Sequence, residues 1–525
     1  MAQKPDYVAS FKKPPNTEIK LISGKWYLYR TSCEYDKESK RPRKKSGEYL
    51  GAIKEDGFHP KRGAALPEVE EEIEIKEAGA TSYFYKRCEY IRTQLQVHFP
   101  DCWQQLFAIA LIRAVHESPL KRIADRYECS ILSEIHPELR LSKDDITPLL
   151  QRVGRDRKHI RLFMVGAYEK KSSSFMLFDG HRLISHSETL ESAHLGYDSK
   201  MRFEPQSNLI CAFSIDGSEC FPAYYKAEDG DVIDSVAFSD VIAEMGIDKK
   251  NVAIIGDKGF NGEGNIDLME DKDLNYVLPL KRNSSELSPL MPVSEALYQG
   301  GFTYAGRPIL FKDCMLEDGR RICIFLDQKM RQKEMGDSFR RTARLNAENL
   351  ERARKEEERR TKGWTPLLSD ERLAELKCPV DPLSVFGDPT RAGTLSLITN
   401  IASCSAEDIY QYYKKREWIE DFFRIYDNTL DFDSSFMRDR YSFEAWLFLN
   451  HLSSLMAYDA LHDIKSNNML KNLSFKDFRV KLSSIAACRS TGEWKVQKLT
   501  DKRKAFLSKF NVDIEGVLAG LNTSA

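Results

Sequence analysis

The sequence has no apolar run long enough to cross a membrane, which takes ~20 mostly apolar residues. Its longest candidate, residues 446–460, is interrupted by polar side chains, among them Asn450 and His451. The N-terminal stretch MAQKPDYVASFKKPP lacks the apolar core of a secretory signal peptide. We therefore expect a soluble, intracellular protein.

Cysteine is sparse and unpatterned in this chain. There are 11 cysteines in 525 residues, with no Cys-x-x-Cys pair and no matching set of histidines. A structural zinc site usually needs such pairs, and a disulfide framework is typical of much smaller, secreted chains. We expect buried or incidental thiols, so neither zinc nor disulfides should be the basis of the fold.

An excess of charge of one sign is also absent, since 79 basic residues stand against 80 acidic ones. A protein whose whole task is to coat nucleic acid is usually basic overall. Local clusters still generate the field that DNA experiences, and two are present, at residues 40–45 and 495–504. Each cluster has two interpretations, a contact with nucleic acid or a solvated loop or helix face.

The first part of the chain changes character near residue 80. Residues 18–52 alternate in the manner of strands and predict a small antiparallel meander within a β-rich region, 1–80. Residues 81–165 follow a helical pattern, with Ser142 placed as the N-cap of one helix. Two short helices joined by a turn can bind DNA ends, but far more often they are simply packed helices.

The next region, 166–282, predicts a mixed sheet. SSFMLFDG is typical of a short apolar strand that ends in Asp179, and HRLISHSE predicts another strand. Further along, NVAIIGDKGF contains a nearly continuous apolar strand, typical of strands buried on both faces, that ends in Asp257. The order β-β-β-α-β-α-β favours an α/β fold in which helices flank the sheet.

The pattern is then interrupted and resumes. Residues 283–393 contain short strands with turns and a highly charged run, 330–361, that predicts a long solvated helix. Within 394–465, LSLITN is typical of a returning strand and two strong helical segments follow. Residues 466–525 form a basic, helical C-terminal region.

Two aspartates occupy positions that suit metal ligands. A strand fixed by the core can hold a carboxylate rigidly where its end opens into a crevice. Asp179 and Asp257 both follow apolar strands, 257 − 179 = 78 residues apart. In the predicted order the first and fourth strands can be neighbours, so the two carboxylates could converge. The alternative is that each aspartate is an ordinary turn residue.

A third carboxylate lies on a helix predicted over residues 409–427. At 3.6 residues per turn, one face carries a polar stripe, while the other faces carry apolar side chains that can pack on the sheet. The stripe comprises Tyr413, Arg416, Glu420, Arg424 and Asp427. It is either a functional surface or a solvent-facing stripe in which Arg416 and Glu420 form an i,i+4 ion pair.

These residues together resemble a known family. The segment YKKREWIE, from Tyr413 to Glu420, matches the tyrosine–arginine–glutamate–lysine signature of one subgroup of bacterial insertion-sequence transposases of the DDE type. FDG at 178–180 and GDKGF at 256–260 look like the first and second aspartate motifs of that subgroup. The resemblance covers about residues 170–282 and 390–460.

The resemblance implies a fold and a chemistry. It implies an RNase H-like core with a mixed five-stranded sheet, interrupted by a β-rich insertion at 283–393. It further implies that Asp179, Asp257 and Glu420 are catalytic and hold two Mg²⁺ or Mn²⁺ ions, the hard cations that suit oxygen ligands. Two ions can stabilise the attacking and leaving oxygens of a phosphodiester displacement. The expected reactions are cleavage of the element's ends and their joining to target DNA.

The resemblance also implies partners. Tyr413, Arg416 and, beside Asp257, Lys258 are expected to contact DNA, because arginine in particular suits phosphate. The DNA would be the terminal inverted repeats and the target, bound by a homodimer without any membrane. We expect a cytoplasmic, nucleoid-associated protein.

Some positions depart from the family pattern. Asp427 stands where the family has its lysine, which removes a phosphate contact and adds negative charge. His181 follows Gly180 where hydroxyl residues are commoner, and it is either a catalytic helper or a structural histidine. Trp364 and Phe339 are candidates for stacking on a flipped base by residue type alone. The alternatives are an RNase H-like nuclease that does not join strands, an inactive DNA-binding descendant of a transposase, and an α/β protein with accidental motifs.

Overall fold

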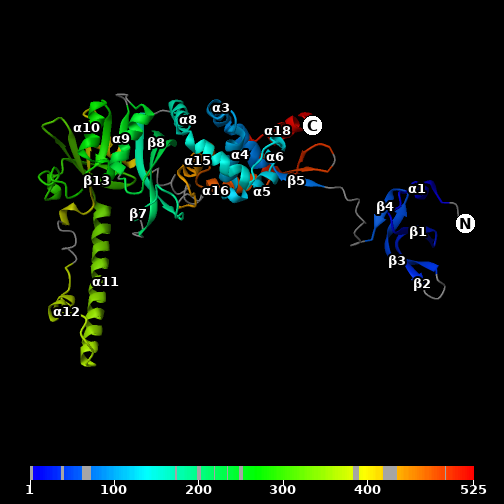
Figure 1. Ribbon diagram of the computed structural model, residues 1–525, viewed down its shortest axis with the longest axis horizontal. Coiled ribbons are helices and arrows are strands. Elements are labelled where there is room, and N and C mark those ends of the chain that lie inside the picture. The colour runs from blue at the N-terminus through cyan, green and yellow to red at the C-terminus, as the bar shows by residue number, and fades with distance from the viewer. Residues whose placement is uncertain are drawn as a thin grey trace. The chain divides into compact units, whose positions relative to one another are not determined.

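The computed structural model divides the chain into two compact units (Figure 1). One comprises residues 1–75 with 488–495, and the other comprises 76–487 with 496–525. The structure describes residues 4–36, 41–61, 73–171, 174–197, 203–217, 219–232, 234–247, 252–381, 389–417, 434–490 and 492–524.

The first unit contains the meander that strand alternation predicts. Its four strands pair in the order β1-β2-β3-β4, each antiparallel to the next. One sheet face packs with a short helix, α1, around Trp26, Leu28 and Ile53. The elements are α1 (Asp6–Ala9), β1 (Thr17–Ile22), β2 (Lys25–Asp36), β3 (Arg41–Lys54) and β4 (Gly57–Pro60).

The second unit begins with a set of packed helices, as the helical pattern of 81–165 predicts. Ser142 caps α7 as expected, because its side chain accepts from the Asp145 N–H and forms a capping box. The helices are α2 (Gly79–Arg87), α3 (Glu89–His98), α4 (Trp103–His116), α5 (Ile123–Glu128), α6 (Leu132–Ile135), α7 (Lys143–Arg155) and α8 (Arg157–Glu169).

A mixed sheet follows, and its centre has the expected α/β architecture. Five strands lie in the order β9-β8-β6-β10-β11. β8 is antiparallel to both β6 and β9, whereas β10 is parallel to both β6 and β11. This is the predicted RNase H-like arrangement. The elements are β6 (Phe175–Ser185), β7 (His194–Tyr197), β8 (Phe203–Asp216), β9 (Glu219–Glu228), α9 (Asp234–Met245), β10 (Ala253–Ile255), α10 (Glu263–Asp271) and β11 (Asn275–Pro279).

The described sheet is larger than the five strands expected. The segment predicted to return, LSLITN, is antiparallel to β11 and continues the sheet toward three strands from the region 283–393. That region also contains the predicted long helix, α11, which extends away from the sheet with α12 (Figure 1). The elements are β12 (Gly300–Tyr304), β13 (Arg307–Met315), β14 (Arg321–Asp327), α11 (Gln328–Thr361), α12 (Asp370–Lys377) and β15 (Thr394–Thr399).

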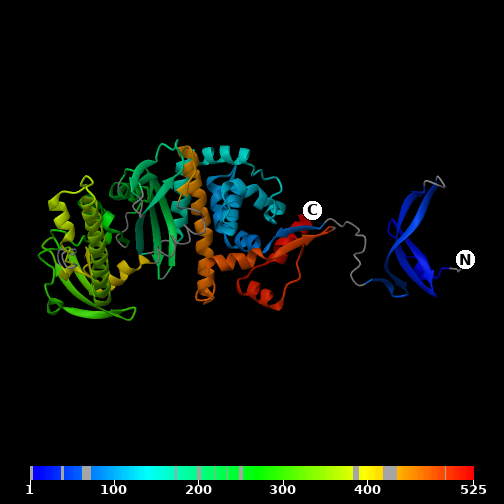
Figure 2. The ribbon, with the colours of Figure 1, turned by 90° about the horizontal axis from the view of Figure 1, so that it is seen from below.

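A long helix, α15, joins the sheet to the helical part of the same unit. It packs against β9 on one side and against α4 and α7 on the other, as Figure 2 shows. Its side chains from Ala445 to Ala460 are buried. The remaining elements are β5 (Glu74–Glu77), α13 (Ala406–Lys414), β16 (Ser434–Ser435), α15 (Arg440–Ser466), α16 (Phe475–Ser483), β17 (Ala486–Arg489), β18 (Lys495–Val496), α17 (Asp501–Lys509) and α18 (Ile514–Ser524).

The composition of α15 also bears on membranes. Although its buried part is rich in apolar residues, His451 and Asp459 interrupt it. Among the residues that the structure describes, no helix combines the length and the apolar character that a membrane span requires.

Candidate active site

Asp179 lies in β6, and Asp257 lies at the equivalent place two residues beyond the end of β10, the neighbouring parallel strand. The register pairs Leu177 of β6 with Ile255 of β10, an offset of 255 − 177 = 78 residues. The two aspartates are separated by the same 78 residues, and each lies two positions beyond that pair. The expectation that the first and fourth predicted strands are neighbours is therefore confirmed.

Asp179 does not end its strand, which corrects the expectation from sequence. β6 runs without a break to Ser185, because residues 180–184 continue to pair with β8. On the other side, pairing with β10 stops at Leu177 and pairing with β16 resumes at Ile184. Within the described part of the chain, no strand pairs with β6 on that side beside Asp179, so the carboxylate is placed by an opening between β10 and β16 rather than by a strand end.

The core around β6 fixes the Asp179 side chain. The residue pairs with Cys211 of β8, and the Gly180 N–H donates to Asp179 Oδ1 at 3.1 Å. Burial raises the pKa of the Cys211 thiol, and the charge of Asp179 raises it further. The side chain of Asp179 is 18% exposed, so a carboxylate here is partly desolvated but still accessible.

The GDKGF segment holds Asp257 by local structure. Asp257 Oδ1 accepts the Lys258 N–H at 2.6 Å and caps a 3-10 turn, Lys258–Phe260. The Phe260 ring is buried, and its centre lies 5.5 Å from the centre of the Phe238 ring. A Cβ added at Gly256 would lie 3.0 Å from the side chains of Leu278 and Phe260. The motif thus anchors the turn through Phe260 and leaves the carboxylate at its start.

Arg416 lies between the two carboxylates. Its Nη1 donates to Asp257 Oδ1 at 3.1 Å, and its Nη2 is 3.6 Å from Asp179 Oδ1. Burial opposes the charge of Arg416, but Asp179 and Asp257 raise its pKa above the ordinary value. The paired carboxylates therefore share one cationic group across two strands.

Tyr413 completes the described part of this cluster. Arg416 Nη1 donates to Tyr413 Oη at 3.4 Å, and burial raises the pKa of the Tyr413 hydroxyl. Tyr413 is 9% exposed and belongs to α13, which begins at a capping box formed by Ser405 and Asp408. Grouping Tyr413 and Arg416 as one polar surface is thus consistent with their hydrogen bond.

The helix expected over residues 409–427 is interrupted, however. α13 ends at Lys414, and the Arg416 N–H bonds to the Tyr413 carbonyl in a tightened turn. The ion pair expected between Arg416 and Glu420 cannot be compared, because Glu420, Arg424 and Asp427 lie outside the described residues. Among the described residues, Arg416 contacts Asp257 and Asp179.

The other predicted site residues are placed as follows. Lys258 is exposed directly after Asp257 and makes no ion pair with the described part of the chain. His181 is half-buried two residues beyond Asp179, on the same face of β6. Trp364 is 57% exposed after α11, with the Lys362 Nζ 5.6 Å from its ring centre. Phe339 is exposed on α11.

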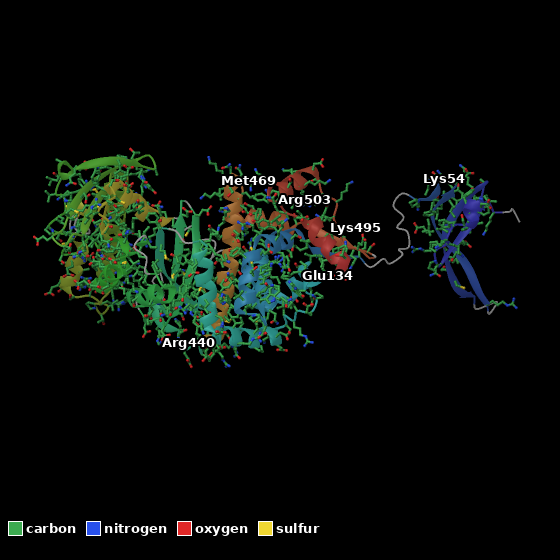
Figure 3. All side chains as sticks on the ribbon, turned by 90° about the horizontal axis from the view of Figure 1, so that it is seen from above. Lys54, Glu134, Arg440, Met469, Lys495 and Arg503 are labelled. Carbon is green, nitrogen blue, oxygen red and sulfur yellow. The ribbon has the colours of Figure 1, made fainter. Side chains whose placement is uncertain are left out.

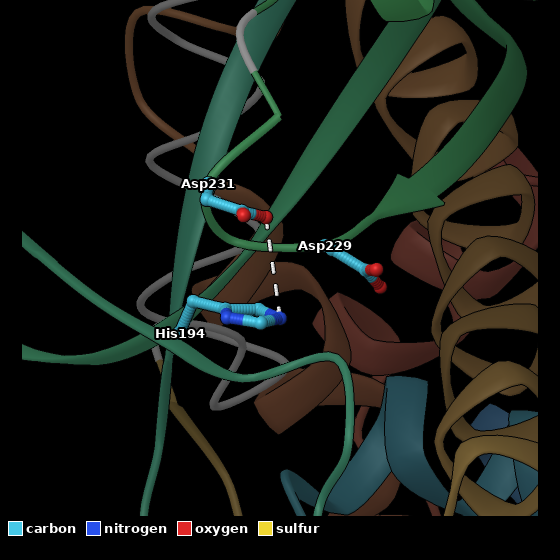
Figure 4. A group of neighbouring side chains, drawn as sticks. All are labelled: His194, Asp229 and Asp231. Carbon is cyan, nitrogen blue, oxygen red and sulfur yellow. Dashed lines mark ion pairs between the residues drawn. The ribbon is translucent and has the colours of Figure 1, made fainter.

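One further group of possible metal ligands was not predicted from sequence. His194 of β7 and the aspartates of the EDGD segment after β9 bring ligand atoms within 4.8 Å of one another (Figure 4). His194 Nε2 is 4.0 Å from Asp231 Oδ1, while Asp229 supplies the third ligand atom. The Gly230 N–H donates to the Ser192 carbonyl at 3.0 Å and holds this loop against β7. The group is exposed, and no second feature of the described residues marks it as a site.

The fold and the site define a class of protein. An RNase H-like strand order with paired carboxylates on adjacent parallel strands is the architecture that the resemblance implied. A family model described as the transposase DDE domain matches residues 170–456, more than half of the chain. The chain therefore belongs to the DDE transposase domain family.

The other comparisons add little. No curated protein matches the chain. A solved structure, the cryo-EM structure of a piggyBac transposase synaptic complex with hairpin DNA, is similar with a TM-score of 0.38 and 10% sequence identity. That likeness covers 78% of this chain and 79% of the other, and it is too slight to carry an argument.

Proposed function

We propose that this DDE transposase cleaves the ends of its own element and joins them to target DNA. The observation that carries the proposal is the placement of Asp179 and Asp257 at equivalent positions on adjacent parallel strands, with a cationic group between them. The proposal also assigns the chain to the bacterial insertion-sequence subgroup with the tyrosine–arginine–glutamate–lysine signature. Its DNA partners would be the terminal inverted repeats and the target.

The donor set fits hard divalent cations. Asp179 and Asp257 offer only carboxylate oxygens, the ligands that Mg²⁺ and Mn²⁺ prefer. The Arg416 guanidinium, which both aspartates attract, stands in for a cation at this position. With Glu420 as the third ligand, two bound ions would activate the attacking oxygen and stabilise the leaving oxygen of an in-line displacement.

The protein side chains would position the DNA. Asp179 and Asp257 hold their carboxylates on a rigid sheet, so the scissile phosphate can be fixed without rearrangement of the core. Tyr413 supplies a hydroxyl and Arg416 a guanidinium fork, both suited to phosphate oxygens. Lys258 is exposed beside Asp257 and would contact the DNA backbone.

The remaining assignments belong to the same proposal. The helical region 81–165 would bind the transposon end, and the region 283–393 would act as an insertion domain between the parts 166–282 and 394–465 of the catalytic core. The protein would act as a homodimer on the nucleoid, in the cytoplasm. Two terminal regions, 1–80 and 466–525, would flank this machinery.

A second candidate is an inactive, DNA-binding descendant of a transposase. Asp427 favours it, because a carboxylate in place of the family's lysine repels DNA phosphate. A nuclease that cuts without joining strands is a third outcome. Labelled end DNA incubated with Mg²⁺ separates them: joined products support the transposase, nicks alone support the nuclease, and binding without cleavage supports the inactive descendant.

A further inference from the structure

The N-terminal meander differs in charge from the rest of the chain. Residues 1–61 contain 14 basic and 8 acidic residues, a net charge of 14 − 8 = +6. Because the whole chain has a net charge of −1, the remaining residues carry −1 − 6 = −7. A polyanion such as DNA is thus attracted to this small part of the chain and repelled, on average, by the larger part.

The two faces of the meander are unlike. Trp26 and Leu28 of β2 point to the face that packs with α1, so the alternate residues Tyr27 and Tyr29 point to the other face. Tyr29 pairs with Tyr49 of β3, which brings the third tyrosine to the same outer face. The ring centres of Tyr27 and Tyr29 lie 5.6 and 5.5 Å from that of Tyr49.

Lysines accompany these tyrosines. Lys20 of β1 pairs with Tyr27, and its Nζ lies 5.2 Å from the centre of the Tyr29 ring. Lys25 precedes Trp26 and therefore shares the outer face, and Lys54 follows Ile53, the register partner of Trp26. Figure 3 labels Lys54 on the meander. Three strands thus bring lysines to the tyrosine face.

Apart from Lys20, the tyrosine hydroxyls and lysines of this face are hydrogen-bond donors without a partner among the described residues. Among the described residues, none accepts a hydrogen bond from the hydroxyls of the three tyrosines, and neither Lys25 nor Lys54 forms an ion pair. Lys20 Nζ lies 3.1 Å from Glu18 Oε1 and also donates to the Ser46 hydroxyl oxygen. Burial, with the neighbouring tyrosines, raises the pKa of Tyr49, so its hydroxyl stays a donor at neutral pH.

We propose that this outer face binds duplex DNA through phosphate oxygens and tethers the chain to DNA of any sequence. Lysines and tyrosine hydroxyls are suitable donors to phosphate, which offers only acceptors. Base stacking is disfavoured, because Tyr27 meets Tyr49 edge to face, at 74°, and so the rings cover one another. The inference rests on the proposed function only in taking DNA as the partner, and it places that contact outside the carboxylate site.

The test measures binding by the full chain, with EDTA present so that no strand is cut. Fluorescence anisotropy with a labelled duplex of unrelated sequence is compared for the wild type and for Lys20→Gln/Lys25→Gln. The affinity of the variant should be on the order of tenfold lower at 0.15 M salt, because two phosphate contacts are lost. Each lost contact removes about one unit from the slope of log K against log salt. The slope of log K against log salt should therefore decrease by about two.

The matched control is Lys12→Gln/Lys13→Gln. This control removes two positive charges, as the Lys20→Gln/Lys25→Gln variant does. It removes them from exposed lysines that precede β1 and lie outside the sheet face. A similar loss in both variants would overturn the site, because it would show a general effect of charge. Tyr27→Phe keeps the ring and removes only the hydroxyl, so a weaker affinity with an unchanged melting temperature would support a direct contact.

The choice of DNA distinguishes this inference from the proposed catalysis. If the Lys20→Gln/Lys25→Gln variant loses affinity equally for the unrelated duplex and for a duplex carrying the element's end, the result supports a tether that tolerates any sequence. A loss confined to the end sequence, unchanged binding of both duplexes, or a loss seen only with RNA or with single strands overturns it. If wild-type binding depends on Lys20 and Lys25 but no cleavage occurs with Mg²⁺, the tether stands while the proposed catalytic function fails.

Discussion

Arg416 donates a hydrogen bond to Asp257 at 3.1 Å, although the two residues are 159 positions apart in the sequence. Arg416 also reaches Asp179, at 3.6 Å, so one guanidinium balances both carboxylates. A divalent ion attracted to the same oxygens must compete with it. Arg416 would then be released toward the DNA phosphate when metal binds.

This competition predicts opposite effects of Arg416→Ala. Metal affinity without DNA should rise on the order of tenfold, since removing a nearby positive charge favours a bound cation by about 1.4 kcal/mol. Cleavage of end DNA should fall, because the phosphate loses its guanidinium. Calorimetric titration with Mn²⁺ measures the first effect. Arg344→Ala, on the exposed surface of α11, is the control, and unchanged or weaker Mn²⁺ binding by Arg416→Ala would contradict the competition.

A partly buried ion pair should hold the sheet to α15. Arg157 donates to Glu444 at 2.7 Å and to the Tyr225 carbonyl at 2.9 Å. Arg157→Met leaves the Glu444 carboxylate, whose side chain is 15% exposed, without a cation, while the Tyr225 hydroxyl still donates to it at 2.9 Å. The free energy of unfolding should fall by about 1–3 kcal/mol, because the pair is partly exposed and Glu444 keeps one donor. Urea denaturation measures it, and Arg344→Met should cost less than about 0.5 kcal/mol.

His451 should make the fold sensitive to acid. The residue is buried in α15, and burial, with the charge of Arg157, lowers its pKa to about 3. Between pH 6.5 and 3 the unfolded chain therefore binds a proton that the folded chain excludes, so stability is lost as pH falls.

His451→Leu should remove that contribution. The decrease in unfolding free energy per pH unit, measured by urea denaturation from pH 6.5 to pH 4, should become smaller by up to about 1.4 kcal/mol. His186→Leu changes an exposed histidine and serves as the control. An identical pH dependence in the His451 variant and the wild type would show that another group is responsible.

Asp427→Lys tests the departure from the family signature. The substitution replaces a negative charge with a positive one, so binding of end DNA should become severalfold tighter and more dependent on salt. Asp427→Asn removes the charge alone and should give an intermediate affinity. Anisotropy titration at two salt concentrations separates the three proteins. Equal affinity in all three would mean that position 427 does not meet the DNA.

The sequence was most informative where local structure sets the site. GDKGF was informative because a buried strand, a turn and an anchoring aromatic ring all lie within one short segment. Asp179 was harder, because β6 continues through residues 180–185 and the sheet opens there only because its described pairing with β10 ends at Leu177. The helix expected over 409–427 was wrong at Lys415, where a turn redirects Arg416.

Most features that could not be predicted from the sequence depend on contacts between segments that are far apart in the chain. Nothing local indicates that Arg416 would meet Asp257, since helical spacing favours the carboxylate of Glu420, which is nearer in the sequence. The sheet also grew beyond five strands because β15 pairs with β14 as well as β11. His194 and Asp231 were likewise brought together by the pairing of separate segments.

The central claim is that Asp179 and Asp257 form the catalytic site, and cleavage of end DNA by Asp257→Asn tests it most directly. With Mg²⁺, the wild type should nick and join labelled end DNA, whereas Asp257→Asn should be slower by more than ~100-fold while binding the DNA with similar affinity. EDTA should abolish the wild-type reaction. Cleavage by Asp257→Asn at the wild-type rate would contradict the account.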